Sequence, residues 1–149
     1  MNTLTYENLH EVKKHVSTQF PYNTYLCSIP LDFTQVPLHW HNDVEIIVIK
    51  KGSGIISVDT EPRTVKAGDI ILVRPGQLHS ISQHEKGSME YENILFQTSL
   101  LYSADSDPRT VGYFQPYFTL EYELPWLFDN TCSCHEGLSS CIDAIDDLC

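Results

Sequence analysis

The pattern of hydrophobic and polar positions in this chain is that of short β-strands joined by polar turns. Apolar residues recur at alternate positions or in short runs, and Gly, Pro, Asn and Asp separate them. Turns are predicted at residues 52–54 and 66–69, and at Pro75-Gly76, a pair that suits the centre of a type II turn. Such a succession of strands is typical of a barrel or sandwich. The predicted strands cover residues 23–29, 36–41, 44–50, 54–59, 61–66, 69–74, 78–84 and 89–97.

Helical spacing of apolar residues appears only near the two ends of the chain. Residues 4–16 predict a short amphipathic helix or arm, with a disordered terminus as the alternative. Near the other end, Ser133-x-x-Glu136 resembles a capping box, and apolar residues follow it at helical spacing to Leu148. We expect this helix either to continue beyond residue 149 or to end as a terminal helix that covers the barrel. The segment 98–130 is rich in aromatic residues and predicts irregular structure that packs on the barrel or on another subunit.

Three histidines and one glutamate occur at spacings that suit a single pocket. His39 and His41 alternate along a predicted strand, so their side chains share one face. A straight strand would place Glu45 about 13 Å from His41, so the chain must bend, and Asn42-Asp43 suits a bend. His79 follows a separate hairpin, and a closed sheet would bring it into the same lumen. We therefore predict a site made of His39, His41, Glu45 and His79.

These residues resemble the two sequence motifs of the cupin superfamily. His39-x-His41-x3-Glu45-x6-Gly52 fits the first motif, and Gly68-x7-Gly76-x2-His79 fits most of the second. The sequence around the two motifs is similar to that of the amino-terminal sensor domain of AraC-type bacterial transcription regulators. The resemblance implies a mainly β fold, a cupin barrel (double-stranded β-helix or jelly roll) with short flanking helices. It also implies that the four residues occupy the family's metal-ligand positions.

The resemblance also implies a division of the chain. We expect an amino-terminal arm or short helix over residues 1–20 and the cupin barrel over 21–100. Residues 101–149 would cover the barrel and begin a dimerisation helix that is cut before a DNA-binding domain. A helix-turn-helix domain would then lie beyond residue 149, and the protein would form a homodimer.

Composition and charge restrict the possible partners. The net charge is −11, with no basic face to neutralise phosphates, so this part of the protein is not expected to bind DNA itself. No apolar run has membrane length and no secretion signal is visible, so we expect a cytoplasmic protein without membrane contact. Five cysteines, an odd number, indicate reduced thiols rather than a disulfide framework.

Three interpretations of the histidine cluster remain open. The four residues bind a divalent ion such as Zn, Ni, Fe or Mn, or they form a metal-free polar pocket for a small effector. The third interpretation is a structural hydrogen-bond network. Cys132-x-Cys134-His135 lacks the spacing of a structural zinc site and is not expected to be one. His10, His15 and His84 have no evident partners and are expected at the surface.

Two functions of different classes follow. The favoured one is a ligand-sensing, dimerising domain of an AraC-type regulator that binds a small effector and controls an absent DNA-binding domain. Sugars are common effectors in that family. The alternative is a small metal-dependent cupin enzyme, an oxygenase or isomerase. We expect no enzyme activity, because no separate acid or base accompanies the four residues and Gln83 replaces the asparagine of the second motif.

Overall fold

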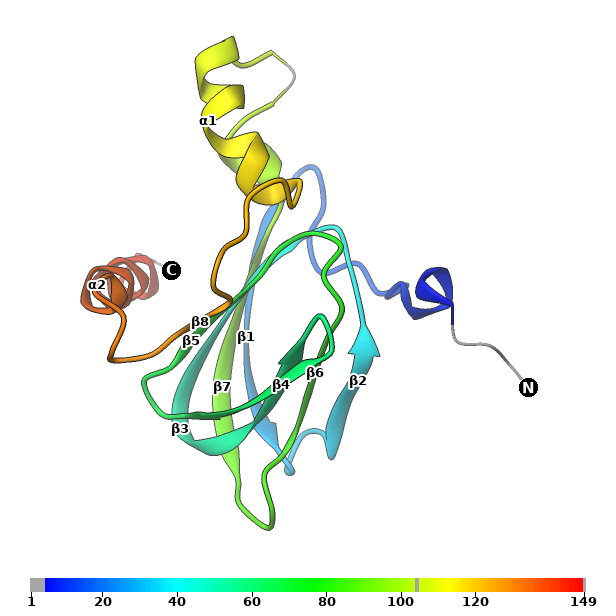
Figure 1. Ribbon diagram of the computed structural model, residues 1–149, viewed down its shortest axis with the longest axis vertical. Coiled ribbons are helices and arrows are strands. Elements are labelled where there is room, and N and C mark those ends of the chain that lie inside the picture. Colours follow the sequence, from blue (N-terminus) through cyan, green and yellow to red (C-terminus); the bar gives the residue numbers. More distant parts are fainter. Residues whose placement is uncertain (1–4, 104, 149) are drawn as a thin grey trace.

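In the part of the chain that the structure describes, eight strands form a barrel with an arm on one side and two helices outside it (Figure 1). The computed structural model describes residues 5–103 and 105–148. The strands are β1 Tyr22–Ile29, β2 Gln35–His39, β3 Val44–Val58, β4 Glu61–Lys66, β5 Ile70–Val73, β6 His79–Gln83, β7 Met89–Phe96 and β8 Leu127–Phe128. The helices are α1 Pro108–Phe118 and α2 His135–Asp146, with 3-10 turns η1 Tyr6–Leu9 and η2 Thr98–Leu100. Within the described residues, neither helix is long and apolar enough to cross a bilayer.

The central element of the barrel is β3, which belongs to both of its walls. The first half of β3 pairs with β7 and β5, and its second half pairs with β4 and β6. Beyond these neighbours, β1 pairs with β7, β8 with β5, and β2 with β6, and every strand pair is antiparallel. The mainly β, antiparallel barrel predicted from the sequence is therefore confirmed.

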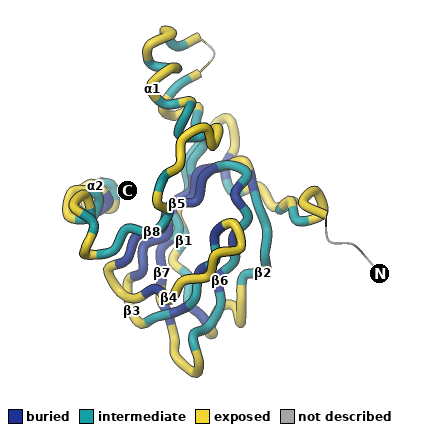
Figure 2. Tube along the Cα trace, in the orientation of Figure 1, coloured by how far each residue is buried: buried dark blue, intermediate teal, exposed yellow. Residues whose placement is uncertain are grey.

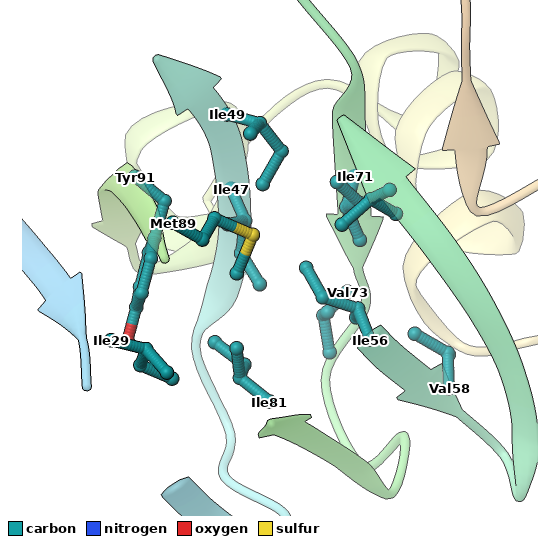
Figure 3. Close-up of a cluster of buried hydrophobic side chains, with 11 residues drawn as sticks. Ile29, Ile47, Ile49, Ile56, Val58, Ile71, Val73, Ile81, Met89 and Tyr91 are labelled. Atoms are coloured by element: carbon teal, nitrogen blue, oxygen red, sulfur yellow. The ribbon is translucent and has the colours of Figure 1, made fainter. Parts of the chain in front are cut away.

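The barrel interior holds the main hydrophobic core. Side chains from both walls meet in the middle, and most of them are isoleucine or valine (Figure 3). Branched residues suit strands because their stiff side chains pack well on a pleated surface. The buried cluster consists of Ile29, Ile47, Ile49, Ile56, Val58, Val65, Ile71, Val73, Ile81, Met89 and Tyr91.

A second, smaller core lies outside the barrel, between α2 and the sheet. On β3, Ile47 faces the interior whereas Val48 packs outward with Ile70, Ile94 and Ile142. Strand alternation therefore explains why this apolar run is buried on both faces. Burying a side chain such as Ile142 contributes about 1.5–3 kcal/mol. The apolar stripe of α2 thus covers the barrel through Ile142 and Leu138, whereas Leu148 is exposed. Figure 2 shows the buried parts of the chain concentrated in the strands, while most of α2 is exposed or intermediate.

The predicted turn at residues 52–54 is wrong, because β3 continues through it. Gly52 adopts a φ of +73°, and the register against β7 shifts between Ile49 and Lys51. This bulge bends the strand and passes it from one wall to the other. The glycines therefore mark a bend in one long strand rather than a hairpin. The turns at Lys66–Asp69 and at Pro75-Gly76 are confirmed by backbone hydrogen bonds that close them.

The predicted amphipathic helix near the amino terminus is mostly absent. From residue 5 on, where the structure describes the chain, only η1 is helical in this segment, and the residues after it run beside the end of β2, where His10 forms a bridge with Trp40. Leu4 of the predicted stripe lies outside the described residues. The segment is an arm because its backbone groups bond to the barrel. Glu11 N–H donates to Trp40 O at 2.9 Å, and Trp40 N–H donates to Leu9 O at 3.0 Å.

Two details of the carboxyl-terminal half also differ from expectation. The segment expected to be irregular contains α1, which begins at an Asp107 N-cap followed by Pro108, a recognised helix start. Arg74 anchors the end of α1 by donating to the carbonyls of Tyr117 and Tyr122. The capping box is also wrong, because α2 begins at His135 after a Cys134 N-cap without a side-chain hydrogen bond.

Candidate functional site: a histidine cluster at the mouth of the barrel

All four residues predicted for the site come together in the barrel. His39 ends β2 and pairs directly with His79, the first residue of β6. The chain bends at Asn42-Asp43 as expected, and Gly76 N–H donates to His41 O at 2.9 Å, which ties the bend to the turn before β6. Glu45 lies on β3 and is buried with His41 and His79, whereas His39 is partly exposed.

Each histidine is oriented by a hydrogen bond on the outer side of its ring. The Nδ1 atoms of His39, His41 and His79 lie 2.8, 3.1 and 3.0 Å from the backbone carbonyls of residues 37, 43 and 77. A carbonyl oxygen only accepts, so each Nδ1 must carry the proton in these bonds. This leaves Nε2 as the reactive nitrogen of each ring. Metal-binding histidines are oriented in the same way.

Glu45 lies between two of these Nε2 atoms. Its Oε2 is 2.9 Å from His41 Nε2 and 3.0 Å from His79 Nε2. Because both Nδ1 atoms already carry protons, these contacts need either a second proton on each ring or a metal cation that the nitrogens and the carboxylate share. The cluster is therefore built to hold positive charge next to Glu45.

The electrostatics of the cluster favour ionised Glu45 and His79 despite their burial. Burial by itself raises the pKa of Glu45, but the hydrogen bonds and charges of His41 and His79 outweigh it and hold the pKa well below its usual range. Burial lowers the pKa of His79, but the hydrogen bond and charge of Glu45 outweigh it, and the net pKa is raised. For His39, burial and the nearby His79 both lower the pKa.

The donor set fits a divalent metal ion. The ligand atoms of His39, His41 and His79 all lie within 4.8 Å of one another. Imidazole nitrogens with a nearby carboxylate suit Zn, Fe, Ni and Mn. Over residues 5–103 and 105–148, this is the one group of three or more possible ligands that lie so close together. Three histidines can therefore form a metal site, with Glu45 in contact with two of them.

A cavity of about 290 Å³ opens beside the cluster. This volume is at the small end for ligand pockets. The walls are largely apolar, with Val36, Ile81, Leu95 and Tyr91 among them. Polar groups face the cavity from the histidine cluster, from Asn93 and from the arm. The arrangement suits a small ligand that is held at one end by polar contacts.

The arm supplies two site residues that sequence reasoning missed. His15, expected at the surface, is partly buried and lies 2.9 Å from Glu11 through its Nε2. Its Nδ1 lies 3.4 Å from the Tyr25 hydroxyl. Glu11 Oε2 is also 3.8 Å from His39 Nε2. The spacing of four between Glu11 and His15 was the one available sequence signal; an arm was expected here, but its docking beside the histidine cluster was not.

The motif Cys132-x-Cys134-His135 lies away from this site. His135 Nε2 donates to Gly68 O at 2.7 Å, so its ring is directed at the barrel rather than at the thiols. The two sulfur atoms lie 3.0 Å apart, with Cys134 exposed. Cys132 and Cys134 therefore lie close together, whereas the His135 ring points away from them.

Fold and site together define a cupin-type barrel with a histidine-rich lumen. Residues 31–140, well over half of the chain, match the family of the AraC-like ligand binding domain. The chain therefore belongs to this family. The match begins before β2 and ends within α2, so it includes all four clustered residues.

One curated relative is an uncharacterized HTH-type transcriptional regulator, YdeC, from Bacillus subtilis. It is 27% identical over 123 residues, which cover 82% of this chain and 41% of the relative. The chain thus spans less than half the length of the relative.

Solved structures with similarity include a cupin protein from Bacteroides fragilis, with 24% identity and a TM-score of 0.49, over 60% of this chain and 75% of that one. A predicted oxalate decarboxylase from Thermotoga maritima has 25% identity and a TM-score of 0.46, over 50% of this chain and 64% of that one. The family assignment rests on the sequence match rather than on these structures.

Proposed function

We propose that this chain is the effector-sensing domain of an AraC-type transcription regulator. The observation that carries the proposal is the cavity beside four inward-facing polar residues, lined on one side by an arm that contacts His39 through Glu11. In this proposal His39, His41, Glu45 and His79 fix the effector, and the apolar walls pack around it. Membership of the AraC-like ligand-binding family supports this function over catalysis.

Effector binding would act on DNA through a separate part of the protein. The relative of this chain is a helix-turn-helix regulator more than twice as long as the matched segment. We propose that a DNA-binding domain is attached to this one, that the regulator is a cytoplasmic homodimer, and that the effector shifts its equilibrium between two states. The effector must bind those states with unequal affinity, or it would transmit nothing.

The dimer is a separate proposal with its own test. The apolar stripe of α2 packs on the barrel through Leu138 and Ile142, so a subunit contact would use other surfaces. Exposed Tyr113 on α1 and Leu148 after α2 are available for it. Light scattering at micromolar concentration should give twice the monomer mass, and a monomer mass would contradict the proposal for residues 1–149.

A metal ion fits the same residues. His39, His41 and His79 would hold it with Glu45, and it would supply a positive charge that attracts an anionic or polar ligand group. The three rings are already directed inward by their backbone hydrogen bonds. One ion per chain would therefore need little rearrangement of these side chains.

The alternative function is a metal-dependent cupin enzyme. One observation favours it: the Glu11–His15 pair lies beside the cluster and supplies the kind of acid-base group that catalysis needs. Turnover of a carbonyl or carboxylate substrate that depends on both the metal and His15 would support the enzyme over the sensor.

The test combines metal analysis with ligand binding in His79→Ala. We expect up to one equivalent of metal in the untagged protein, and loss of both metal and ligand binding in the variant. The barrel should be destabilised but stay folded, because removing one partner of a buried charged pair costs about 3–5 kcal/mol, against the ~5–15 kcal/mol stability of a typical domain. His84→Ala, outside the cluster, is the matched control. Unchanged ligand binding in His79→Ala would refute the proposed site.

A further inference from the structure

The arm places a carboxylate of the chain itself at the histidine cluster. Glu11 Oε2 lies 2.9 Å from His15 Nε2 and 3.8 Å from His39 Nε2. A carboxylate oxygen only accepts, so His15 Nε2–H donates to Glu11, and His39 lies beside this pair.

The position of Glu11 depends on contacts that can be released. The arm holds to the barrel through backbone bonds at Trp40, through a 2.7 Å bond from Trp40 Nε1–H to Tyr6 O, and through the stacked rings of Tyr6 and Trp40. Most of these contacts are at the surface, and no buried apolar side chain precedes Val16 among the described residues of the arm. Segments held mainly by exposed hydrogen bonds open most easily.

The groups around the cavity are complementary to an anion. Four histidines face this region, and Lys13 lies over the Tyr25 ring with its Nζ 5.3 Å from the ring centroid. Glu45 is engaged by His41 and His79, which leaves Glu11 as the carboxylate next to His39 and His15. A ligand carboxylate in the place of Glu11 would accept the hydrogen bond of His15 Nε2–H and lie beside His39.

The cavity indicates the rest of such a ligand. Its apolar walls suit a short hydrocarbon or aromatic body. Asn93 lines the same cavity, and its Oδ1 is a buried acceptor without a hydrogen-bond partner. A buried acceptor of this kind gains from a hydroxyl or amino group on the ligand.

We propose that Glu11 occupies the anion-binding part of the effector site, and that the effector is a small carboxylic acid that displaces it. This inference rests on the proposed function, because it names the effector class of the same cavity. The effector carboxylate takes the place of Glu11 beside His39 and His15, and the arm loses a contact that holds it to the barrel. Binding is thereby coupled to release of the arm.

Competition by Glu11 makes a quantitative prediction. When Glu11 occupies the site, the apparent affinity for a ligand is the intrinsic affinity multiplied by the fraction of molecules in which the site is free. Glu11→Gln keeps the size of the side chain but removes the competing charge, so carboxylates should bind it about tenfold tighter or more. Glu7→Gln changes an exposed glutamate on the same arm and is the matched control, for which no change is expected.

The experiment compares acids with neutral analogues of the same shape. Binding of benzoate, isobutyrate and 2-hydroxyisobutyrate is measured by calorimetry against benzamide, isobutyramide and 2-hydroxyisobutyramide, with arabinose and glucose as neutral sugars. Wild type, Glu11→Gln, Glu7→Gln and His79→Ala are used. Trypsin cleavage after Lys13 or Lys14 reports release of the arm, and benzoate should accelerate it at saturating concentration.

The outcomes separate this inference from the proposed function. Tighter binding of acids than amides, strengthened by Glu11→Gln and accompanied by faster cleavage, supports the inference. If no acid binds better than its amide, or if Glu11→Gln weakens acid binding, the inference is wrong. A sugar that binds wild type but not His79→Ala would overturn the inference while leaving the sensor function standing. Acid binding unaffected by His79→Ala would overturn both.

Discussion

Gly52 offers a direct test of how β3 serves both walls of the barrel. It has a φ of +73°, and a Cβ added there would lie 1.9 Å from Ser88 O. That same oxygen accepts the Ser53 N–H at 3.1 Å, and Gly52 pairs with Met89 on β7. The Gly52→Ala variant must therefore move the backbone of one of two paired segments.

The size of the effect follows from these contacts. A left-handed φ costs a residue with a side chain about 1–2 kcal/mol. Forcing an extra carbon against packed backbone costs about 1–3 kcal/mol more, and the strained hydrogen bond at Ser88 adds about 0.5–1.5 kcal/mol. We expect Gly52→Ala to lower the free energy of unfolding by about 3 kcal/mol or more.

The assay is urea unfolding followed by circular dichroism, with Gly68→Ala as the control. Gly68 also has positive φ, at +95°, but an added Cβ would meet no atom within 4 Å. With a slope of about 2 kcal/mol per molar urea, the midpoint should fall by about 1.5 M for Gly52→Ala and by about 0.5 M for the control. Equal midpoints in the two variants would refute the close approach of β3 and the β6–β7 segment.

Two further predictions concern protons and thiols. In chelator-treated protein, the raised pKa of His79 stabilises the fold fully at pH values below the pKa of an unfolded histidine, about 6.5. The lowered pKa of Glu45 stabilises the fold at pH values above the pKa of an unfolded glutamate, about 4.3. The melting temperature should therefore fall as pH rises through the raised pKa of His79, and Glu45→Gln should flatten this slope; an identical slope in the variant would contradict the pairing. Hydrogen bonds from Cys134 and from nearby backbone lower the pKa of Cys132, whereas burial raises that of Cys27. Iodoacetamide at pH 7.5 should label Cys132 well before Cys27. Mass spectrometry of peptides measures the order of labelling, and the reverse order would contradict the hydrogen bonds described around Cys132.

Local sequence determined most of the strands and two of the three turns. Alternation of apolar residues depends only on the two-residue period of a strand, and Pro75-Gly76 carries its own turn geometry. For the same reason His39 and His41 could be placed on one face, and the bend at Asn42-Asp43 could be expected from residues that bond their own backbone. Such features depend on neighbours along the chain, so the chain alone specifies them.

The tertiary structure decided how segments distant in the sequence pair and pack against one another. Gly52 looked like part of a turn, but it lies inside β3, between the bulge after Ile49 and the start of the pairing with β4 at Ser53. The arm is extended rather than helical because its backbone groups bond to Trp40, and only this docking brings Glu11 to His39. A short amphipathic pattern is a weak helix signal, since a few isolated turns are unstable without packing. The sequence thus determined that His39, His41, Glu45 and His79 share the barrel, and the fold decided that Glu11 lies next to them.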